Sequence, residues 1–272
     1  MKEIVAVGIL AILVLNCAGA KDDYKRNMAN GRKAEVIILG CVHQRHKDHK
    51  YFRTAVLKNI LVKLDADIIL IEEPIEFFVD GKPVPGEEEA IMRSGSAEEL
   101  REAWKLCKSG KAKCLPFDIK GRDDYYIDEK YNEKQEKFFQ ALEKTVKIER
   151  PNIYDALDRA SSLEVECANS FPETINSILC DEIAKQKITY IGKEVKYAMK
   201  EMGLQEVEFA KMFKAFWQKR NQEMEKNICK IVEENIGRRI VVTVGWNHRY
   251  ILKELIKNNC PKAEMREYWE LL

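Results

Sequence analysis

The stretch Glu35–Gly40, which reads EVIILG, decides the fold. A short apolar run with β-branched residues that is closed by glycine is typical of a strand buried on both faces. Helical periodicity follows over residues 51–64, where apolar side chains recur every four residues. The next apolar run, Ile68–Ile71, predicts a second buried strand. A strand, a helix and a strand at this spacing form a βαβ unit, so the two strands should be parallel.

The same pattern returns at the carboxyl end of the chain. Arg239–Val244 is another apolar, β-branched run ended by a glycine, and residues 250–257 are expected to form the helix that follows. Lys113–Ile119 is a further strand candidate, and residues 263–268 are expected to form a last strand at the sheet edge. Residues 123–237 predict long, charged, amphipathic helices.

We therefore predict an α/β fold, with a mostly parallel central sheet, βαβ units at both ends of the chain and a large helical insertion at about residues 121–212. Residues 34–272 should form a single domain, because no segment is rich enough in proline, glycine or serine to mark a linker. Residues 79–89 contain two prolines and two glycines, which predicts a loop.

The charge balance excludes some classes of partner. The 272 residues include 46 Lys and Arg against 45 Asp and Glu, a formal net charge of +1. This balance argues against binding to nucleic acid or to an anionic membrane surface. The composition, 46% hydrophobic and 33% charged, is that of a globular chain rather than a disordered one.

The first twenty residues have the pattern of an export signal. The apolar run Ile4–Leu15 is too short to span a bilayer and has the length of a signal-peptide core. Ala18–Ala20 offers a cleavage site, whereas Cys17 could instead accept lipid as in a bacterial lipoprotein. A buried first strand or an uncleaved anchor is the alternative. We expect an exported protein (periplasmic, secreted or a lipoprotein that touches the membrane only through its anchor), with residues 21–33 as a polar tether.

The eight cysteines agree with export, since many cysteines in one chain favour disulfides in an oxidising compartment. Apart from Cys17, six fall into pairs by region and Cys41 is left over. Sequence alone does not fix the connectivity. The pairing that we expect is Cys107–Cys114, Cys167–Cys180 and Cys229–Cys260.

Reactive side chains follow three of the predicted strands. Gly40-x-x-His43 ends the first, Glu72 ends the second and Gly245-x-x-His248 ends the last. Because parallel sheets bind ligands beyond the carboxyl ends of their strands, these side chains should share one cleft. Two imidazoles and a carboxylate are a ligand set for a catalytic divalent metal such as Mn²⁺, Co²⁺ or Zn²⁺, which activates water. The alternative is that both histidines have ordinary roles in loops.

Arg220 is expected to point inward, because it shares a helix face with Trp217 and Met224. A buried arginine needs an anionic partner, which could be Glu72, a substrate carboxylate or a developing oxyanion. A purely structural ion pair is the alternative.

The remaining polar residues near these motifs carry weaker indications. Glu73 is expected to be a solvated loop carboxylate, since adjacent strand residues point to opposite faces. His46 and His49 lie among charged residues and are expected to be solvated, with metal binding or contact with the substrate as the alternatives. Asp118 could support the site as an outer carboxylate or cap the next helix. Cys41 is a candidate soft ligand, although a small buried residue is favoured.

Four sequence elements, in this order, resemble the pattern of the TraB/Tiki superfamily: Gly40-x-x-His43, Glu72, Arg220-Asn221-x-x-Met224 and Gly245-x-x-His248. That superfamily also takes in erythromycin-esterase-like and haem-uptake lipoprotein branches. The resemblance covers roughly residues 35–74 and 216–256. It implies an α/β fold with a pseudo-symmetric pair of Gly-x-x-His elements. The second strand of TraB-like members usually ends in Glu-Leu-Asp, whereas here it ends in Glu-Glu-Pro.

The resemblance implies hydrolysis of a peptide or ester bond, by a metal-dependent peptidase as in the Tiki branch or with a water activated by histidine as in the esterase branch; we expect the metal-dependent reaction. His43 and His248 would bind the metal or its water, Glu72 would be a ligand or general base, and Arg220 would stabilise negative charge. The expected partner is therefore a peptide, an ester or another small molecule. The alternatives are a non-catalytic lipoprotein that binds haem, a metal or a small ligand, and a regulatory interaction protein. No Gly-x-Ser-x-Gly, phosphate-binding glycine loop or His-Glu-x-x-His sequence indicates another class of enzyme.

Overall fold

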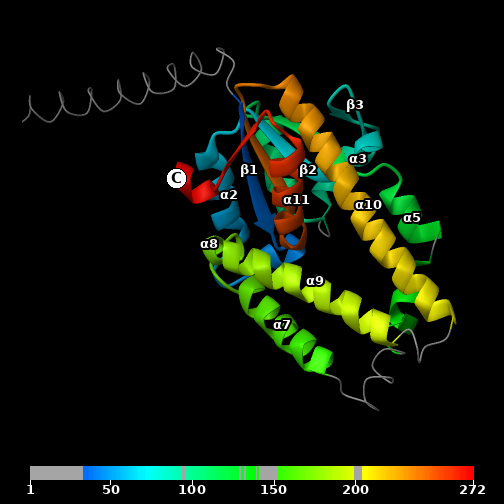
Figure 1. Cartoon of the computed structure of the whole chain (residues 1–272). Helices are drawn as coiled ribbons and strands as arrows, with labels where there is room; N and C mark the ends of the chain where they lie inside the picture. The colour runs from blue at the N-terminus through cyan, green and yellow to red at the C-terminus, as the bar shows by residue number, and fades with distance from the viewer. Residues whose placement is uncertain are drawn as a thin grey trace, which may run out of the picture.

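A five-stranded parallel sheet forms the centre of the molecule (Figure 1). The computed structural model describes residues 33–93, 96–128, 130–131, 133–138, 140, 152–198 and 204–272. The strand order is β5-β2-β6-β1-β7, and all neighbouring strands are parallel. The predicted α/β fold is therefore confirmed. The strands are β1 (Ala34–Cys41), β2 (Ile68–Pro74), β5 (Lys113–Asp118), β6 (Arg239–Gly245) and β7 (Ala263–Arg266).

The two ends of the chain meet in the middle of this sheet. β6 inserts between β1 and β2, with Val241 opposite Ile37 on one side and opposite Ile69 on the other. Residues of these three strands are buried almost throughout, which is why each strand is a continuous apolar run in the sequence. The carboxyl ends of β1, β2 and β6 lie next to each other, at the edge where parallel sheets bind ligands.

Helices cover both faces of the sheet and complete a three-layer arrangement (Figure 1). The expected insertion is helical over its described residues. The helices are α2 (Thr54–Leu64), α3 (Glu87–Met92), α4 (Glu98–Lys108), α5 (Arg122–Asp128), α7 (Asn152–Ala168), α8 (Pro172–Ile175), α9 (Ile178–Ala198), α10 (Leu204–Glu234) and α11 (Trp246–Asn259), with short 3-10 helices at His43–Lys47, Ile75–Phe77 and Tyr268–Leu271.

Alternate side chains of β1 enter two separate cores. Ile37 and Leu39 pack in the core that also holds the apolar residues of α2 and α4. Val36 and Ile38 pack in the other core, with Met224 of α10. This is the two-residue alternation of a strand covered on both faces. The buried Met224 also places the inward face of α10 against the sheet, as its sequence pattern predicts.

Two local predictions need correction. Residues 79–89 are not a plain loop, because Phe78–Val79 (β3) pairs with Lys82–Pro83 (β4) and α3 begins at Glu87. Three glutamates in the first turn of α3 favour this helix through its macrodipole. Helix α11 begins at Trp246 rather than at residue 250, since Trp246 already packs in the core. His248 therefore lies in the first turn of a helix.

Two of the three expected disulfides are formed, and the third is not. Cys229 and Cys260 are free, buried thiols, and the thiol of Cys229 donates a hydrogen bond to Oε1 of Glu225. Cys41 is free and buried, as expected. The disulfides join α4 to β5 and α7 to α9 through Cys107–Cys114 and Cys167–Cys180.

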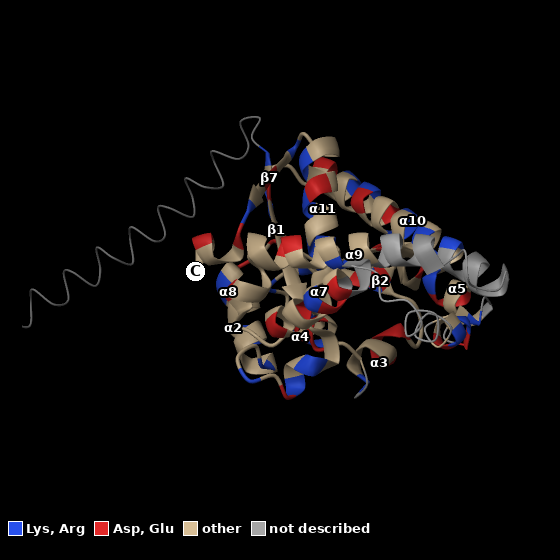
Figure 2. Cartoon of the chain, turned by 60° about the horizontal axis from the view of Figure 1, so that its bottom comes forward, with Lys and Arg blue, Asp and Glu red and all other residues tan. Residues whose placement is uncertain are grey.

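The predicted export signal, residues 1–20, and nearly all of the tether, residues 21–33, lie outside the described residues. Over the described part of the chain, no helix has both the length and the apolar character needed to cross a bilayer. Acidic and basic residues alternate along the ribbon in Figure 2, as the near-zero net charge leads one to expect.

Candidate functional site

The two Gly-x-x-His elements lie side by side, because β1 and β6 are neighbours with Cys41 opposite Gly245. Each glycine makes room for the other element. A Cβ atom at Gly245 would lie 2.5 Å from Nε2 of His43, and one at Gly40 would lie 3.0 Å from Cβ of Trp246. The glycines are therefore needed for close approach between the two elements.

Glu72, at the end of β2, is the carboxylate that lies beside both histidines. One of its oxygens accepts a hydrogen bond from Nη2 of Arg220 at 2.6 Å, and the other accepts the backbone N–H of Gly245 at 2.7 Å. Burial favours the neutral carboxyl group, but the positive charge of Arg220 and the nearby histidines outweigh it. The pKa of Glu72 is lowered to about 2, so this group is ionised at neutral pH.

Arg220 is held by two carboxylates, which agrees with its predicted inward orientation. Its Nε and Nη2 donate to the two oxygens of Asp118 at 2.9 and 2.7 Å, while Nη2 also donates to Glu72. Asp118 is fully buried and accepts a further hydrogen bond from Arg122 at 2.9 Å. Arg122 also pairs with Glu73 at 3.3 Å. Two arginines and three carboxylates thus form one network of buried and half-buried charges.

His248 is buried against α10. Its Nδ1 lies 2.7 Å from Oδ1 of Asn221, an acceptor, so Nδ1 carries the proton. Nε2 then accepts a hydrogen bond from Nη1 of Arg220 at 3.4 Å, and the ring stacks on Trp217. Burial and the charge of Arg220 outweigh the attraction of Glu72 and lower the pKa of His248 to about 4. The ring is therefore neutral at neutral pH.

His43 has a different environment, because its side chain is 44% exposed and is paired with a carboxylate. Its Nδ1 lies 2.5 Å from Oε1 of Glu99, a buried residue of α4. Burial opposes protonation, but the hydrogen bond and charge of Glu99 and the charge of Glu72 raise the pKa of His43 to about 9. The φ angle of His43 is 55°, in the left-handed region that non-glycine residues rarely adopt. Backbone of this kind is concentrated at functional sites.

A cavity of about 230 Å³ opens beside His43. Arg220 and His248 are buried and are not part of its lining, so they support Glu72 from within the protein. The ionisable residues that line the cavity are His43, Glu72, Glu73, Glu99 and Arg122.

Glu73 is not the solvated carboxylate that the sequence predicted. Its side chain is only 13% exposed, lines the cavity and pairs with Arg122. The register of β2 is irregular between Ile71 and Pro74, so simple strand alternation fails at this end. Burial and the negative charges of nearby acidic residues raise the pKa of Glu73, and the positive charge of Arg122 lowers it by less. The resulting pKa is about 7.

His46 and His49 are buried, so the expectation that they are solvated was wrong. Nε2 of His46 accepts the N–H of Val42 at 3.1 Å, and its Nδ1 donates to the carbonyl of Phe52 at 2.6 Å. Nδ1 of His49 accepts the N–H of Phe52 at 2.8 Å, and its Nε2 donates to the carbonyl of Ala168. Both rings therefore pair with backbone groups, those of Val42 and Phe52 for His46 and those of Phe52 and Ala168 for His49, a role that the charged neighbours in the sequence conceal.

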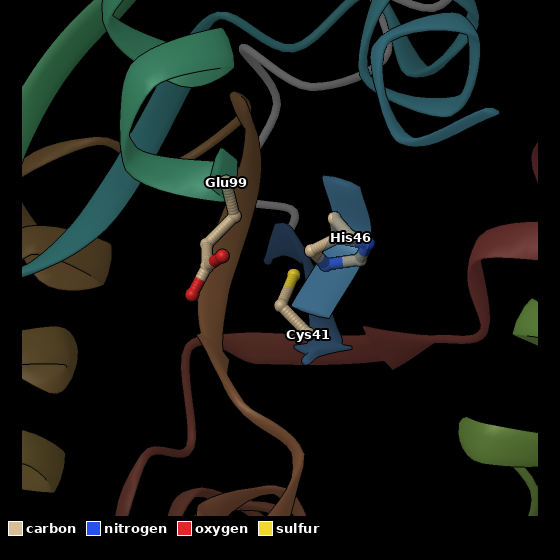
Figure 3. Close-up of side chains that lie close together, drawn as sticks. All are labelled: Cys41, His46 and Glu99. Atoms are coloured by element: carbon tan, nitrogen blue, oxygen red, sulfur yellow. The ribbon is translucent and has the colours of Figure 1, made fainter. Parts of the chain in front are cut away.

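Cys41, His46 and Glu99 form a buried group that could hold a metal ion (Figure 3). The sulfur of Cys41, one ring nitrogen of His46 and one carboxylate oxygen of Glu99 all lie within 4.8 Å of one another. Thiolate, imidazole and carboxylate are the ligands that zinc takes in proteins. Since Glu99 also lines the cavity, this group adjoins the candidate site.

The fold brings the four residues expected from the sequence to one region, two of them at the cavity and two inside the protein. His43 and Glu72 line the cavity, whereas Arg220 and His248 are buried. Both oxygens of Glu72 accept hydrogen bonds, and Nε2 of His248 faces Arg220. A metal shared by His43, Glu72 and His248 would have to displace Arg220. The metal role of these three residues stays a prediction.

Glu99 and Arg122 were not among the site residues predicted from the sequence. Glu99 lies in the first turn of α4, which carries no motif, and acidic residues in a first helical turn are common for electrostatic reasons alone. Arg122 forms an ion pair with Asp118, but Asp118 is the last residue of β5 and Arg122 is the first residue of α5, so the four-residue spacing that pairs residues on one helix does not indicate it.

No family model, no curated protein and no solved structure matches this chain. The TraB/Tiki resemblance accordingly rests on the four sequence elements and stays a prediction. Function has to be argued from the geometry of the site, since a fold shared by many activities does not specify one.

Proposed function

We propose that the protein hydrolyses ester or peptide bonds of small substrates, with His43 as the general base that activates water. The observation that carries this proposal is the pair of His43 and Glu99 at the cavity. Oε1 of Glu99 lies 2.5 Å from Nδ1 of His43 and fixes the orientation of the ring. The His43 side chain lines the cavity, so its other nitrogen, Nε2, is left to act on water. A carboxylate that orients a histidine is the arrangement by which many hydrolases activate a nucleophile.

The reaction needs the neutral form of His43. Nε2 takes a proton from water, and the resulting hydroxide adds to the carbonyl carbon of the substrate. His43 then gives the proton to the leaving alkoxide or amine as the bond to carbon breaks. One water is consumed, and the products are a carboxylic acid and an alcohol or an amine.

Glu72 and Arg220 are given supporting roles in this mechanism. Glu72 is ionised and lines the cavity, so it stabilises the imidazolium that forms when His43 takes the proton. Every guanidinium nitrogen of Arg220 is hydrogen-bonded to Asp118, Glu72 or His248. Arg220 is therefore a positioning residue that keeps Glu72 charged and in place.

The cavity supports a small polar substrate. Its volume of about 230 Å³ lies below the range of roughly 300–1,000 Å³ that is usual for pockets enclosing drug-sized ligands. Arg122 borders the cavity, and its bond to Glu73 is its longest at 3.3 Å. A positive charge there suits the carbonyl oxygen, which becomes negative during hydrolysis. The size favours a short ester or dipeptide over haem.

The proposal includes export, because the two disulfides support an oxidising compartment.

The proposed mechanism does not use a metal ion. A divalent ion at His43, Glu72 and His248 would activate water by lowering its pKa. The observed arrangement does not offer these atoms to a metal, because Arg220 occupies the hydrogen-bonding positions of Glu72 and His248.

Hydrolysis of chromogenic esters and dipeptide anilides by the purified full-length protein tests the proposal. We expect turnover that survives EDTA, and a loss of about 100-fold or more in His43→Gln, which is the usual contribution of a general base. Glu99→Gln should also lose activity. Glu98→Gln is the matched control, because Glu98 is the adjacent buried glutamate and pairs with Arg101 instead.

Equal rates in wild type and a folded His43→Gln protein would contradict the proposal, as would an absence of hydrolysis of all these substrates. Activity that requires added Mn²⁺, Co²⁺ or Zn²⁺ and disappears in His248→Gln would instead support the metal-dependent mechanism predicted from the sequence.

A further inference from the structure

The buried group beside His43 contains a charged oxygen that the proposed mechanism does not use. Cys41 and His46 are 0% exposed and Glu99 is 2% exposed. Oε1 of Glu99 binds His43, but Oε2 has no hydrogen-bond partner among the described residues. A buried carboxylate oxygen without a partner is costly, so it indicates a ligand that satisfies it.

We propose that Cys41, His46 and Glu99 bind a divalent metal ion of intermediate softness, with Zn²⁺ as the favoured ion and Co²⁺ as its spectroscopic substitute. Their ligand atoms lie within 4.8 Å of one another (Figure 3). Tetrahedral zinc, with bonds of about 2.0–2.3 Å, holds its ligands roughly 3.5 Å apart, so the most distant ligand atoms would have to approach each other by up to about 1.3 Å on binding. Calcium and magnesium are disfavoured because they prefer oxygen ligands alone.

The orientation of His46 suits a metal ligand. Its Nδ1 donates to the carbonyl of Phe52 at 2.6 Å, which fixes the tautomer and leaves the lone pair on Nε2. A metal-binding histidine usually has such a carbonyl partner on its other nitrogen. Nε2 accepts the N–H of Val42 at 3.1 Å, and a metal bond would replace this single hydrogen bond.

The charge and the access of the site also fit a divalent ion. On binding, the thiol of Cys41 releases its proton to solvent and the thiolate takes a bond to the metal. The thiolate and the Glu99 carboxylate then offset most of the charge of the ion, although Glu99 is shared with His43. Glu99 lines the cavity, which gives the ion a route from solvent and gives a water molecule access to the fourth position.

Cobalt titration of the full-length protein tests the site, because a thiolate bound to Co²⁺ has a charge-transfer absorption band that oxygen and nitrogen ligands lack. We expect one Co²⁺ per chain with this band, and its displacement by Zn²⁺. Cys41→Ser should abolish the band and weaken binding at least tenfold, and Glu99→Gln should also weaken binding at least tenfold. Two matched controls should retain the band: Glu98→Gln, and the double variant Cys229→Ser/Cys260→Ser, which removes the other buried free thiols.

A second measurement needs no variant and so does not depend on the folding of Cys41→Ser. Because Cys41 is 0% exposed, alkylation is measured at a urea concentration at which the metal-free thiol reacts. Zn²⁺ should slow this reaction in the wild-type protein, while Cys229 and Cys260 serve as internal references by mass spectrometry. Absence of the cobalt band, its persistence in Cys41→Ser, or equal alkylation of Cys41 with and without Zn²⁺ would overturn the proposal.

This inference does not depend on the proposed hydrolysis, and the two can fail separately. His43→Gln should stop hydrolysis and keep the cobalt band, because His43 is not one of the three ligands. His248→Gln should also keep the band. Loss of metal binding in His43→Gln and His248→Gln, with binding retained in Cys41→Ser, would place the metal at the residues first expected from the sequence and overturn the site at Cys41.

Discussion

His43 and His248 end the same Gly-x-x-His sequence on adjacent parallel strands, yet their environments differ in every respect that matters for chemistry. His43 is half-exposed, pairs with Glu99 and has its pKa raised to about 9. His248 is buried, bonds to neutral Asn221 and positive Arg220, and has its pKa lowered to about 4. At neutral pH one ring is mainly an imidazolium at a cavity and the other is a neutral acceptor inside the protein.

The difference comes from the helix that meets each histidine rather than from the repeated motif. Helix α4 brings the carboxylate of Glu99 to the first histidine, whereas α10 brings Arg220, Asn221 and Trp217 to the second. A repeated backbone element can therefore provide one reactive side chain and one that orders the site. The experiments below test this division, beginning with the largest expected effect.

Arg220→Met should destabilise the protein most. It would leave Glu72 and Asp118, both buried or nearly so, without their shared cation. Removing one partner from a buried ion pair costs about 3–5 kcal/mol. Urea unfolding of the variant measures this, with Lys219→Met as an exposed control on the same helix. A loss below about 1 kcal/mol would mean that Arg122 alone can compensate both carboxylates.

The two histidines should affect stability in opposite pH ranges. The pKa of His248 falls from 6.5 to about 4 on folding, so the unfolded chain binds protons more readily and stability is lost as the pH falls from 6.5 to 4. A shift of this size corresponds to about 3 kcal/mol. The pKa of His43 rises on folding, so its contribution is lost as the pH rises from 6.5 through 9. This contribution should be the smaller one although the two shifts are similar, because the His43 side chain is 44% exposed and solvent screens its charge.

Unfolding free energies measured from pH 4 to 9 separate the two groups. His248→Gln should flatten the acid side of the profile and leave the alkaline side unchanged, and His43→Gln should do the reverse. If both variants changed the unfolding free energy in the same pH range, the pKa values of the two histidines would not differ as described.

The rate of hydrolysis should follow His43 and not His248. With a pKa of about 9, only a small fraction of His43 is neutral at pH 7, and kcat/KM should rise roughly 50-fold between pH 7 and 9. Glu99→Gln removes the charge that stabilises the imidazolium, so it should move the midpoint of this rise to lower pH. A profile centred near pH 4 would assign the base to His248 instead.

Much of the fold could be predicted from the sequence, whereas the site could be predicted only in part. The strands of the sheet centre are buried on both faces, so runs such as Ile68–Ile71 show them directly. Glu72 and the two histidines follow such strands, and the sheet topology alone brings them together. Glu99 and Arg122 come from helices whose position depends on tertiary packing. The burial of His46 depends on hydrogen bonds from its ring to the backbone of Val42 and Phe52, which no sequence pattern indicates.

Gly40 and Gly245 allow the most detailed test of how the two Gly-x-x-His elements differ, because an added Cβ atom at each would meet a different part of the other element. A Cβ at Gly40 would lie 3.1 Å from the backbone Cα of Trp246, which cannot move without shifting the start of α11. A Cβ at Gly245 would meet the ring of His43, which can move because it borders a cavity. Gly40→Ala should therefore cost about 1–3 kcal/mol of stability, as overpacking does. Gly245→Ala should cost less stability and should lower kcat by displacing Nε2 of His43 from the substrate.

Urea unfolding and steady-state kinetics on both variants measure the two effects. A larger loss of stability in Gly245→Ala than in Gly40→Ala would show that His43 is held as rigidly as the backbone of α11.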